Sequence, residues 1–211
     1  MKQFQWLVVL YLWAMLSSVG QANEMDYGET VDGVFHNTYL GFSVTLPKDW
    51  VLQDQAAQRK IMKFGSKLLA GDDANLTAVL KASEQQAVNL FAVFQYPLGT
   101  PGLFNPSISM VAENVGAIPG IRNGQDYLIQ TKAILQQGKM DVTIADNMVT
   151  EIISGQMFDS MHTVMKVGQV KVFQKYYAIK IKEYVLVAVL SFNDDDQATH
   201  LDRVLNTLVF D

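Results

Sequence analysis

The sequence predicts an α+β fold in which a mainly antiparallel sheet is flanked by helices, an α/β/α sandwich. Residues 157–192 form three β-type segments joined by very short connections, which favours antiparallel pairing. Two segments, 88–96 and 184–192, are apolar on both faces and therefore belong in the middle of the sheet. Helical periodicity appears early, in the middle and at the end of the chain, so we expect layers on both faces.

A strand and its boundary stand out before residue 50. Phe42, Val44 and Leu46 alternate with polar residues, which predicts a half-buried strand. Pro47 ends this strand because it cannot donate to a central ladder. We expect Trp50 to pack over the edge of the sheet, with an aromatic ligand platform as the alternative.

The segment 53–70 has the period of a helix, and Gly71 ends it. Its apolar residues fall at i, i+4, i+7 and i+11, a stripe that we expect to face the core: Ala57, Ile61, Phe64 and Leu68. On the other side, Arg59, Lys63 and Lys67 follow at i, i+4 and i+8, with Lys60 beside them. We expect an ordinary solvated face, and the alternative is a docking stripe for an anionic partner, either phospholipid headgroups or an acidic envelope protein.

The remaining elements follow the same periodicities. We expect a short helix around 76–81, a Pro- and Gly-rich loop at 97–106, strands at 108–112 and 140–146, a helix at 126–137 closed by Gly138, and a last helix at 195–208. One face of the last helix should be buried: Ala198, Leu201, Leu205 and Leu208. Because no internal repeat or linker interrupts the pattern, 23–211 is predicted to be a single globular domain.

The first 22 residues have the pattern of a cleavable signal peptide. Lys2 supplies the positive charge, 4–16 the apolar region, and Gly20 and Ala22 the small residues before the cleavage site. We therefore expect cleavage after Ala22 and export to the periplasm or a comparable extracellular space; the alternative is an uncleaved anchor. No later apolar run is long enough to span a bilayer.

Charge and composition exclude several classes of function. The chain has no cysteine, which excludes disulfides, thiolate metal sites and cysteine nucleophiles. A net charge of −5 argues against non-specific binding of nucleic acid.

Residues 39–50, Tyr-Leu-Gly-Phe-Ser-Val-Thr-Leu-Pro-Lys-Asp-Trp, together with the closing strand–helix pair, resemble exported bacterial proteins of the PsbP-like superfamily. That superfamily has an antiparallel sheet between helices, and its members include assembly factors and binding accessories. The resemblance implies the fold, indicates almost nothing about activity, and carries over no functional residue.

Three histidines are candidates for chemistry: His36, His162 and His200. A serine hydrolase would need a base such as His162, but the chain lacks a Gly-x-Ser-x-Gly elbow, so we interpret His162 as a partly exposed sheet residue. The run 194–196 and His200 could hold half a metal site, yet acidic residues at a helix start are typical of N-caps. We give Asp72 and Asp73 the same interpretation.

The sequence thus assigns no catalytic, cofactor-binding or metal-binding residue. It favours an exported accessory or binding protein that is not an enzyme. The alternatives are a hydrolase without a recognisable motif and a lipid-handling domain whose cavity the sequence does not reveal.

Overall fold

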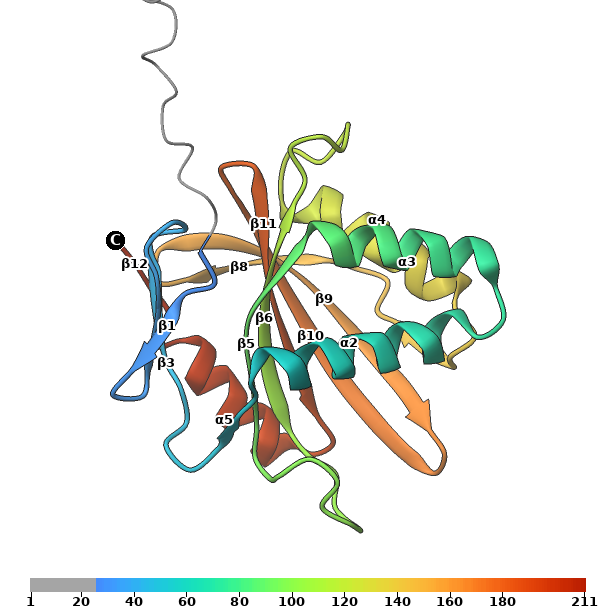
Figure 1. Cartoon of the computed structure of the whole chain (residues 1–211), viewed down its shortest axis with the longest axis horizontal. Helices are drawn as coiled ribbons and strands as arrows, with labels where there is room; N and C mark the ends of the chain where they lie inside the picture. The colour runs from blue at the N-terminus through green and yellow to red at the C-terminus, as the bar shows by residue number, and fades with distance from the viewer. Residues whose placement is uncertain (1–25) are drawn as a thin grey trace, which may run out of the picture.

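The computed structural model describes residues 26–211, and the predicted signal peptide lies outside the described residues. Most strands belong to one large antiparallel sheet with the order β4-β5-β6-β11-β10-β9-β7, in which β8 also pairs with β9 (Figure 1). Its strands are β4 (Val51–Leu52), β5 (Ala87–Phe94), β6 (Ser107–Asn114), β7 (Val142–Ile144), β8 (Val149–Ile153), β9 (Gln156–Val167), β10 (Val170–Ile181) and β11 (Tyr184–Phe192). The long β9, β10 and β11 form the predicted meander.

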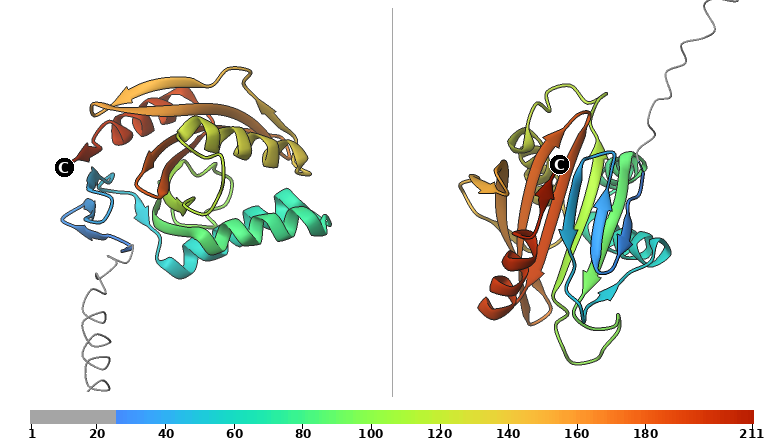
Figure 2. Two further views of the ribbon diagram at one scale, coloured as in Figure 1. Left: turned by 90° about the horizontal axis from the view of Figure 1, so that it is seen from above. Right: turned by 90° about the vertical axis from the view of Figure 1, so that its left-hand side faces the viewer.

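A second, four-stranded sheet has the order β1-β2-β3-β12. Its strands are β1 (Glu29–Val31), β2 (Val34–Asn37), β3 (Phe42–Thr45) and β12 (Val209–Phe210). The last strand of the chain therefore pairs with β3, whose register places Phe210 opposite Phe42. This small sheet and α5 (Asp195–Leu205) lie side by side on one face of the large sheet (Figure 2, right).

The other three described helices, α2 (Gln55–Ala70), α3 (Ala74–Gln86) and α4 (Gly124–Gln137), lie on the opposite face. The large sheet curves round α4, and α2 and α3 lie across its open side (Figure 2, left). Each helix begins after a side chain that accepts a first-turn backbone N–H: Asp54 for α2 (2.7 Å), Asp73 for α3 (2.9 Å), Asn123 for α4 (2.8 Å) and Asp194 for α5 (2.8 Å).

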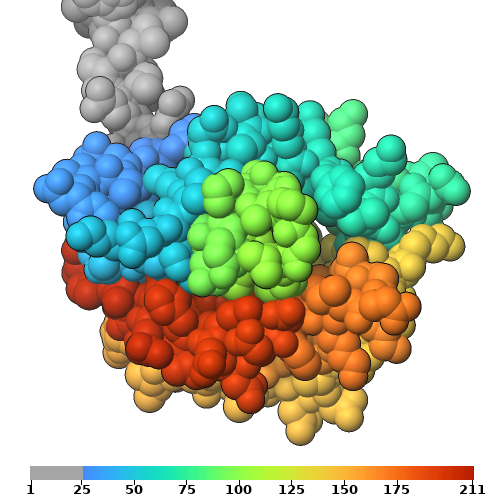
Figure 3. Space-filling model, turned by 90° about the horizontal axis from the view of Figure 1, so that it is seen from below, coloured from blue at the N-terminus to red at the C-terminus, as the bar shows by residue number. Residues whose placement is uncertain are grey.

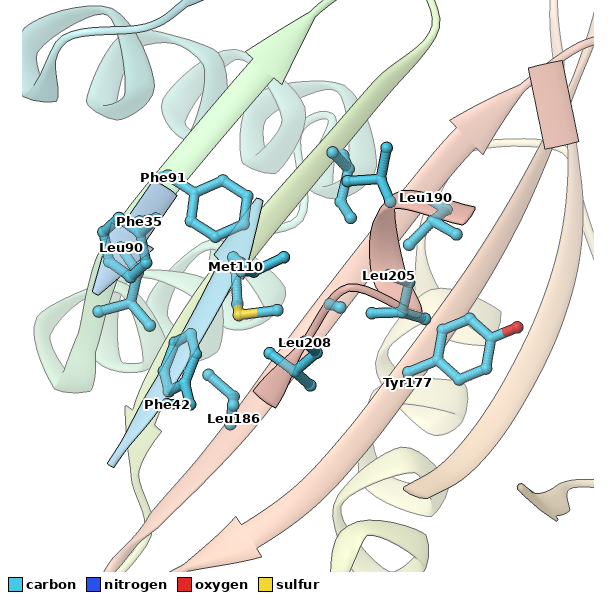
Figure 4. Close-up of a cluster of buried hydrophobic side chains, with 14 of the residues drawn as sticks. Phe35, Phe42, Leu90, Phe91, Met110, Tyr177, Leu186, Leu190, Leu205 and Leu208 are labelled. Carbon is cyan, nitrogen blue, oxygen red and sulfur yellow. The ribbon is translucent and has the colours of Figure 1, made fainter. Parts of the chain in front are cut away.

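The main core lies between the large sheet, the small sheet and α5. Phe35 and Phe42 of the small sheet, both 2% exposed, meet Phe91 of β5 and the apolar face of α5 there (Figure 4). The predicted buried face of the last helix is largely correct, since Leu201, Leu205 and Leu208 are all buried. The predicted α+β fold with layers on both faces is confirmed, although one layer combines a helix with a second sheet.

The apolar stripe predicted for α2 is wrong. Phe64 is 65% exposed and Leu68 is 44% exposed, while the buried residues of the helix are Gln58, Leu69 and Ala70. Ala57 and Ile61 are half-buried, so only the first half of the stripe faces the rest of the molecule. The helical period of 53–70 is correct, but which side of the helix is buried depends on contacts with residues far away in the chain.

Some of the predicted elements and boundaries also need correction. The short strands β1, β8 and β12 were not predicted, because two to five residues give little periodicity. The helix expected around 76–81 extends over the whole of α3, Ala74–Gln86. The last helix ends at Leu205, and the chain turns at Asn206 into the strand that completes the small sheet.

The 39–50 motif is anchored at both of its ends. The Tyr39 hydroxyl donates to the Glu183 carboxylate in the turn between β10 and β11, and this bond raises the pKa of Tyr39 to about 12. Trp50 packs against the main core, as expected, but it is only half-buried and stacks on His200 at 5.2 Å between ring centres. Within 26–211, no helix combines the length and hydropathy that a membrane span requires.

Candidate functional site

A cavity of about 410 Å³ lies between α2 and the curved face of the large sheet. Its floor is formed by β5, β6, β11 and β10, and its walls by α2 and the 97–106 loop. Seen from below, the molecule is hollowed between α2, this loop and the turn that joins β9 to β10 (Figure 3). The volume falls in the range of small-molecule sites, roughly 300–1,000 Å³.

The two faces of the central strands differ in burial. On the core side, Ile108, Met110 and Leu190 are 0% exposed. On the cavity side of the same strands, Ser109 and Ser191 are half-buried. A layer that was fully packed would bury both faces of strands this central. Helix α2 therefore covers this face of the sheet but leaves a space between itself and the strands.

The floor carries a chain of directed hydrogen bonds. The Tyr176 hydroxyl donates to Gln174 Oε1 at 2.6 Å, and Gln174 Nε2 donates to Ser191 Oγ at 2.9 Å. Because Ser191 accepts from Gln174, its own O–H is free to donate into the cavity. Burial raises the pKa of Tyr176 to about 12, so the network is uncharged at neutral pH.

The walls are mainly apolar. Ile61 and Met62 of α2 and Phe104 of the 97–106 loop line the cavity beside Phe94 of β5. The loop is fixed by Asn105, whose side chain accepts from the Tyr96 N–H and donates to the Tyr96 carbonyl, both at 2.8 Å. These two bonds close the base of the loop beside the cavity.

Helix α2 is held at its two ends and spans the cavity between them. Near its start, Gln55 Nε2 donates to the carbonyl of Asn89 at 2.9 Å, which ties the helix to β5. At its end, the Lys139 N–H donates to the Leu69 carbonyl at 2.7 Å, next to Gly138. A Cβ at Gly138 would lie 2.1 Å from Leu69 Cδ1, so any larger residue would force the Leu69 side chain to move. Between these two ends, Ile61 lines the cavity, and a Cβ at Gly65 would meet nothing within 4 Å.

A buried carboxylate ties two helices to the sheet on this same side. Glu113 of β6 is 7% exposed and accepts from Tyr127 of α4 at 2.7 Å and from Ser83 of α3 at 2.9 Å. Burial, reinforced by the Glu113 charge, raises the pKa of Tyr127 well above its ordinary value. Both partners of Glu113 donate to it, so its carboxylate is used to hold α3 and α4 in place.

His162 lies on the opposite face of the sheet from the cavity. It is exposed on β9 opposite Lys175, which pairs with Asp202 of α5 at 2.7 Å. Burial and then the Lys175 ammonium lower the pKa of His162. In the described part of the chain no hydrogen bond joins Ser160 to His162; Ser160 Oγ donates to Glu151 at 2.7 Å. Ser160 and His162 therefore do not form the serine–histidine pair of a hydrolase.

The other acidic and histidine candidates have structural roles. Asp194 caps α5, Asp73 caps α3, and His200 stacks on Trp50. These are the capping roles that the sequence predicts for the two acidic runs. Among residues 26–211, no three His, Asp or Glu side chains gather closely enough to share a metal ion.

The basic stripe is exposed, as expected, but it flanks a groove. Arg59, Lys63 and Lys67 line the groove between α2 and α3, and Lys81 of α3 faces them with Glu84 nearby. The Glu84 carboxylate accepts from Ser66 Oγ at 2.6 Å. The three ion pairs found among residues 26–211 do not include any of these four cations.

Sequence reasoning missed the cavity-lining residues, although one signal was present. The core-side residues Ile108 and Met110 are apolar, whereas Ser107 and Ser109 alternate with them on a strand buried in mid-sheet. Polar residues facing inward on a central strand indicate either a buried network or a cavity. The same signal recurs at Gln174.

No protein-family model matches the sequence. A comparison with curated protein sequences finds no match either. Among solved structures, the chain is similar to the cyanobacterial PsbP protein CyanoP from Synechocystis sp. PCC 6803, with 12% identity, 93% of this chain and 99% of that chain covered, and a TM-score of 0.46. It is also similar to LpqN, described as involved in cell envelope biogenesis of Mycobacterium tuberculosis, with 14% identity, 80% and 82% covered, and a TM-score of 0.38. Such likenesses concern the fold alone.

Proposed function

We propose that this chain is an exported, non-catalytic binding protein that holds an uncharged amphipathic small molecule under α2. One observation carries the proposal: a cavity of about 410 Å³ with apolar walls has a row of uncharged polar groups along its floor. Apolar walls would bind the body of such a ligand, while Ser191, Gln174 and the serines of β6 would bind its hydroxyl or amide groups.

The same lining argues against catalysis at this site. Of the described side chains that line the cavity, none is Asp, Glu, His, Lys or Arg, and Tyr176 stays protonated at neutral pH. A general acid or base would need a pKa near the working pH. His162, which the hydrolase alternative would use, lies on the other side of the sheet. The lidded cavity instead favours the lipid-handling alternative, in which the ligand has an apolar chain.

Filling the cavity is expected to abolish binding of an uncharged apolar probe. N-phenyl-1-naphthylamine, whose fluorescence rises in apolar surroundings, should bind the wild type saturably. Ser109→Phe places a ring on the floor and should weaken binding at least about tenfold, the equivalent of ~1.4 kcal/mol. Thr143→Phe, which places the same ring on the exposed side of β7, should bind as the wild type does. Probe binding that is absent in the wild type, or equal in Ser109→Phe, would contradict the proposal.

Export is the second part of the proposal, and it is supported by the pattern of the first 22 residues. We expect the protein recovered from the cell envelope or medium to begin at Asn23. Intact-mass spectrometry measures this directly. A mass that still includes Met1–Ala22 would show that the segment is retained as an anchor.

A further inference from the structure

The exposed apolar side chains around the cavity entrance extend its lining outward. Phe64 and Leu68 follow the cavity-lining Ile61 at i+3 and i+7, so they share its side of α2. Phe64 is 65% exposed and Leu68 is 44% exposed. Both were expected in the core, and both instead lie beside the entrance.

The other two sides of the entrance repeat this pattern. On β10, Val170 lies on the same face as the cavity-lining Val172, and it pairs with Val167 of β9. Val170 is 42% and Val167 49% exposed. In the 97–106 loop, Leu98 is 47% and Leu103 59% exposed. We call these six residues the entrance rim; they come from the three segments that surround the hollow in Figure 3.

Positive charge is concentrated next to this rim. Helix α2 carries four cations and no carboxylate, although the chain as a whole has a net charge of −5: Arg59, Lys60, Lys63 and Lys67. The 97–106 loop has no charged residue, and Lys171 lies next to Val170. An apolar stripe flanked by lysines is typical of helices that lie in the surface of an anionic bilayer. The negative charge elsewhere would be repelled by that surface, which would orient the molecule with its entrance facing the lipid.

We propose that the entrance rim and the cations of α2 form a docking surface for an anionic phospholipid bilayer. Phe64 and the other rim residues enter the headgroup region, and Lys63 and Lys67 contact lipid phosphates. If the cavity holds a ligand, as proposed above, this orientation lets the ligand pass between bilayer and cavity without exposure to water. Docking itself does not depend on that ligand.

Co-sedimentation with vesicles tests the docking surface. Phosphatidylcholine vesicles with and without phosphatidylglycerol are compared at low and high salt, and all variants share one processed N-terminus. We expect the wild type to favour vesicles that contain phosphatidylglycerol, and high salt to weaken its binding. Lys63→Glu/Lys67→Glu should lower the partition coefficient about 30-fold, the equivalent of ~1 kcal/mol for each cation. Phe64→Ser should lower it about tenfold through the loss of apolar contact.

The matched control is Lys132→Glu/Lys180→Glu, which makes the same change in net charge on α4 and β10. Its partition coefficient should stay within about twofold of the wild type, because the altered charges are not at the docking surface. Thermal unfolding of each variant shows that it is folded. Equal binding to both vesicle types, or an equal loss in the control, would overturn the proposal. Salt-sensitive retention on an acidic envelope protein without vesicle binding would also overturn it and would identify a protein partner instead. Vesicle binding without N-phenyl-1-naphthylamine binding would overturn the proposed ligand site alone.

Discussion

Replacing Phe42 with alanine is expected to lower the free energy of unfolding by about 3–5 kcal/mol, the usual cost of emptying a large aromatic site. The Phe42 ring is 2% exposed and lies 5.8 Å from Phe35 and 6.1 Å from Phe210, between ring centres. Phe42 belongs to the small sheet, and its ring packs into the core between the two sheets. Alanine would therefore leave a cavity between the two layers. Chemical denaturation measures the change.

Phe64→Ala is the matched control, with the same atoms removed from another aromatic residue. Because Phe64 is 65% exposed, the free energy of unfolding should change by less than about 0.5 kcal/mol. The helical stripe of the sequence predicts the opposite, a core residue at position 64. Equal destabilisation by the two substitutions would therefore show that α2 packs through its apolar stripe after all.

This pair of residues shows which parts of the fold can be predicted from sequence. Phe42 alternates with polar neighbours beside a proline, and these local signals determine both the strand and its buried face. Similarly, local N-caps such as Asp54 and Asp194 determine where helices begin. Phe64 is different because the side of a helix that becomes buried depends on its tertiary neighbours. In α2 those neighbours are Asn89 and Lys139, which hold the ends of the helix and leave its middle above the cavity.

The candidate site was harder to predict than the fold for a related reason. Its polar residues come from four strands, α2 and the 97–106 loop, and no single segment contains a recognisable motif. Ser107 and Ser109 read simply as the polar half of an alternating strand. They indicate a cavity only once β6 is placed between β5 and β11, because both faces of such a central strand should be covered. Short pairings such as β12 with β3 were missed because they also depend on distant partners.

Gly124→Ala is expected to destabilise the protein by about 3 kcal/mol, the upper part of the range for overpacking. Gly124 begins α4 where the helix touches β10. A Cβ there would lie 2.2 Å from the carbonyl oxygen of Ala178, a backbone atom in the middle of β10 that cannot rotate away. The start of α4 would have to move, which would also strain the bond from the Gln125 N–H to Asp159 at 2.8 Å.

Gly65→Ala is the same substitution in the middle of α2, and it should act in the opposite direction. A Cβ at Gly65 meets nothing within 4 Å. Alanine removes the entropic cost of glycine in a helix, so the free energy of unfolding should rise by roughly 0.5–1 kcal/mol. Denaturation curves of the two variants measure both changes in the free energy of unfolding, the decrease for Gly124→Ala and the increase for Gly65→Ala. If Gly65→Ala also destabilised the protein, α2 would have to sit closer to the sheet than the structure places it, with less room for a ligand beneath.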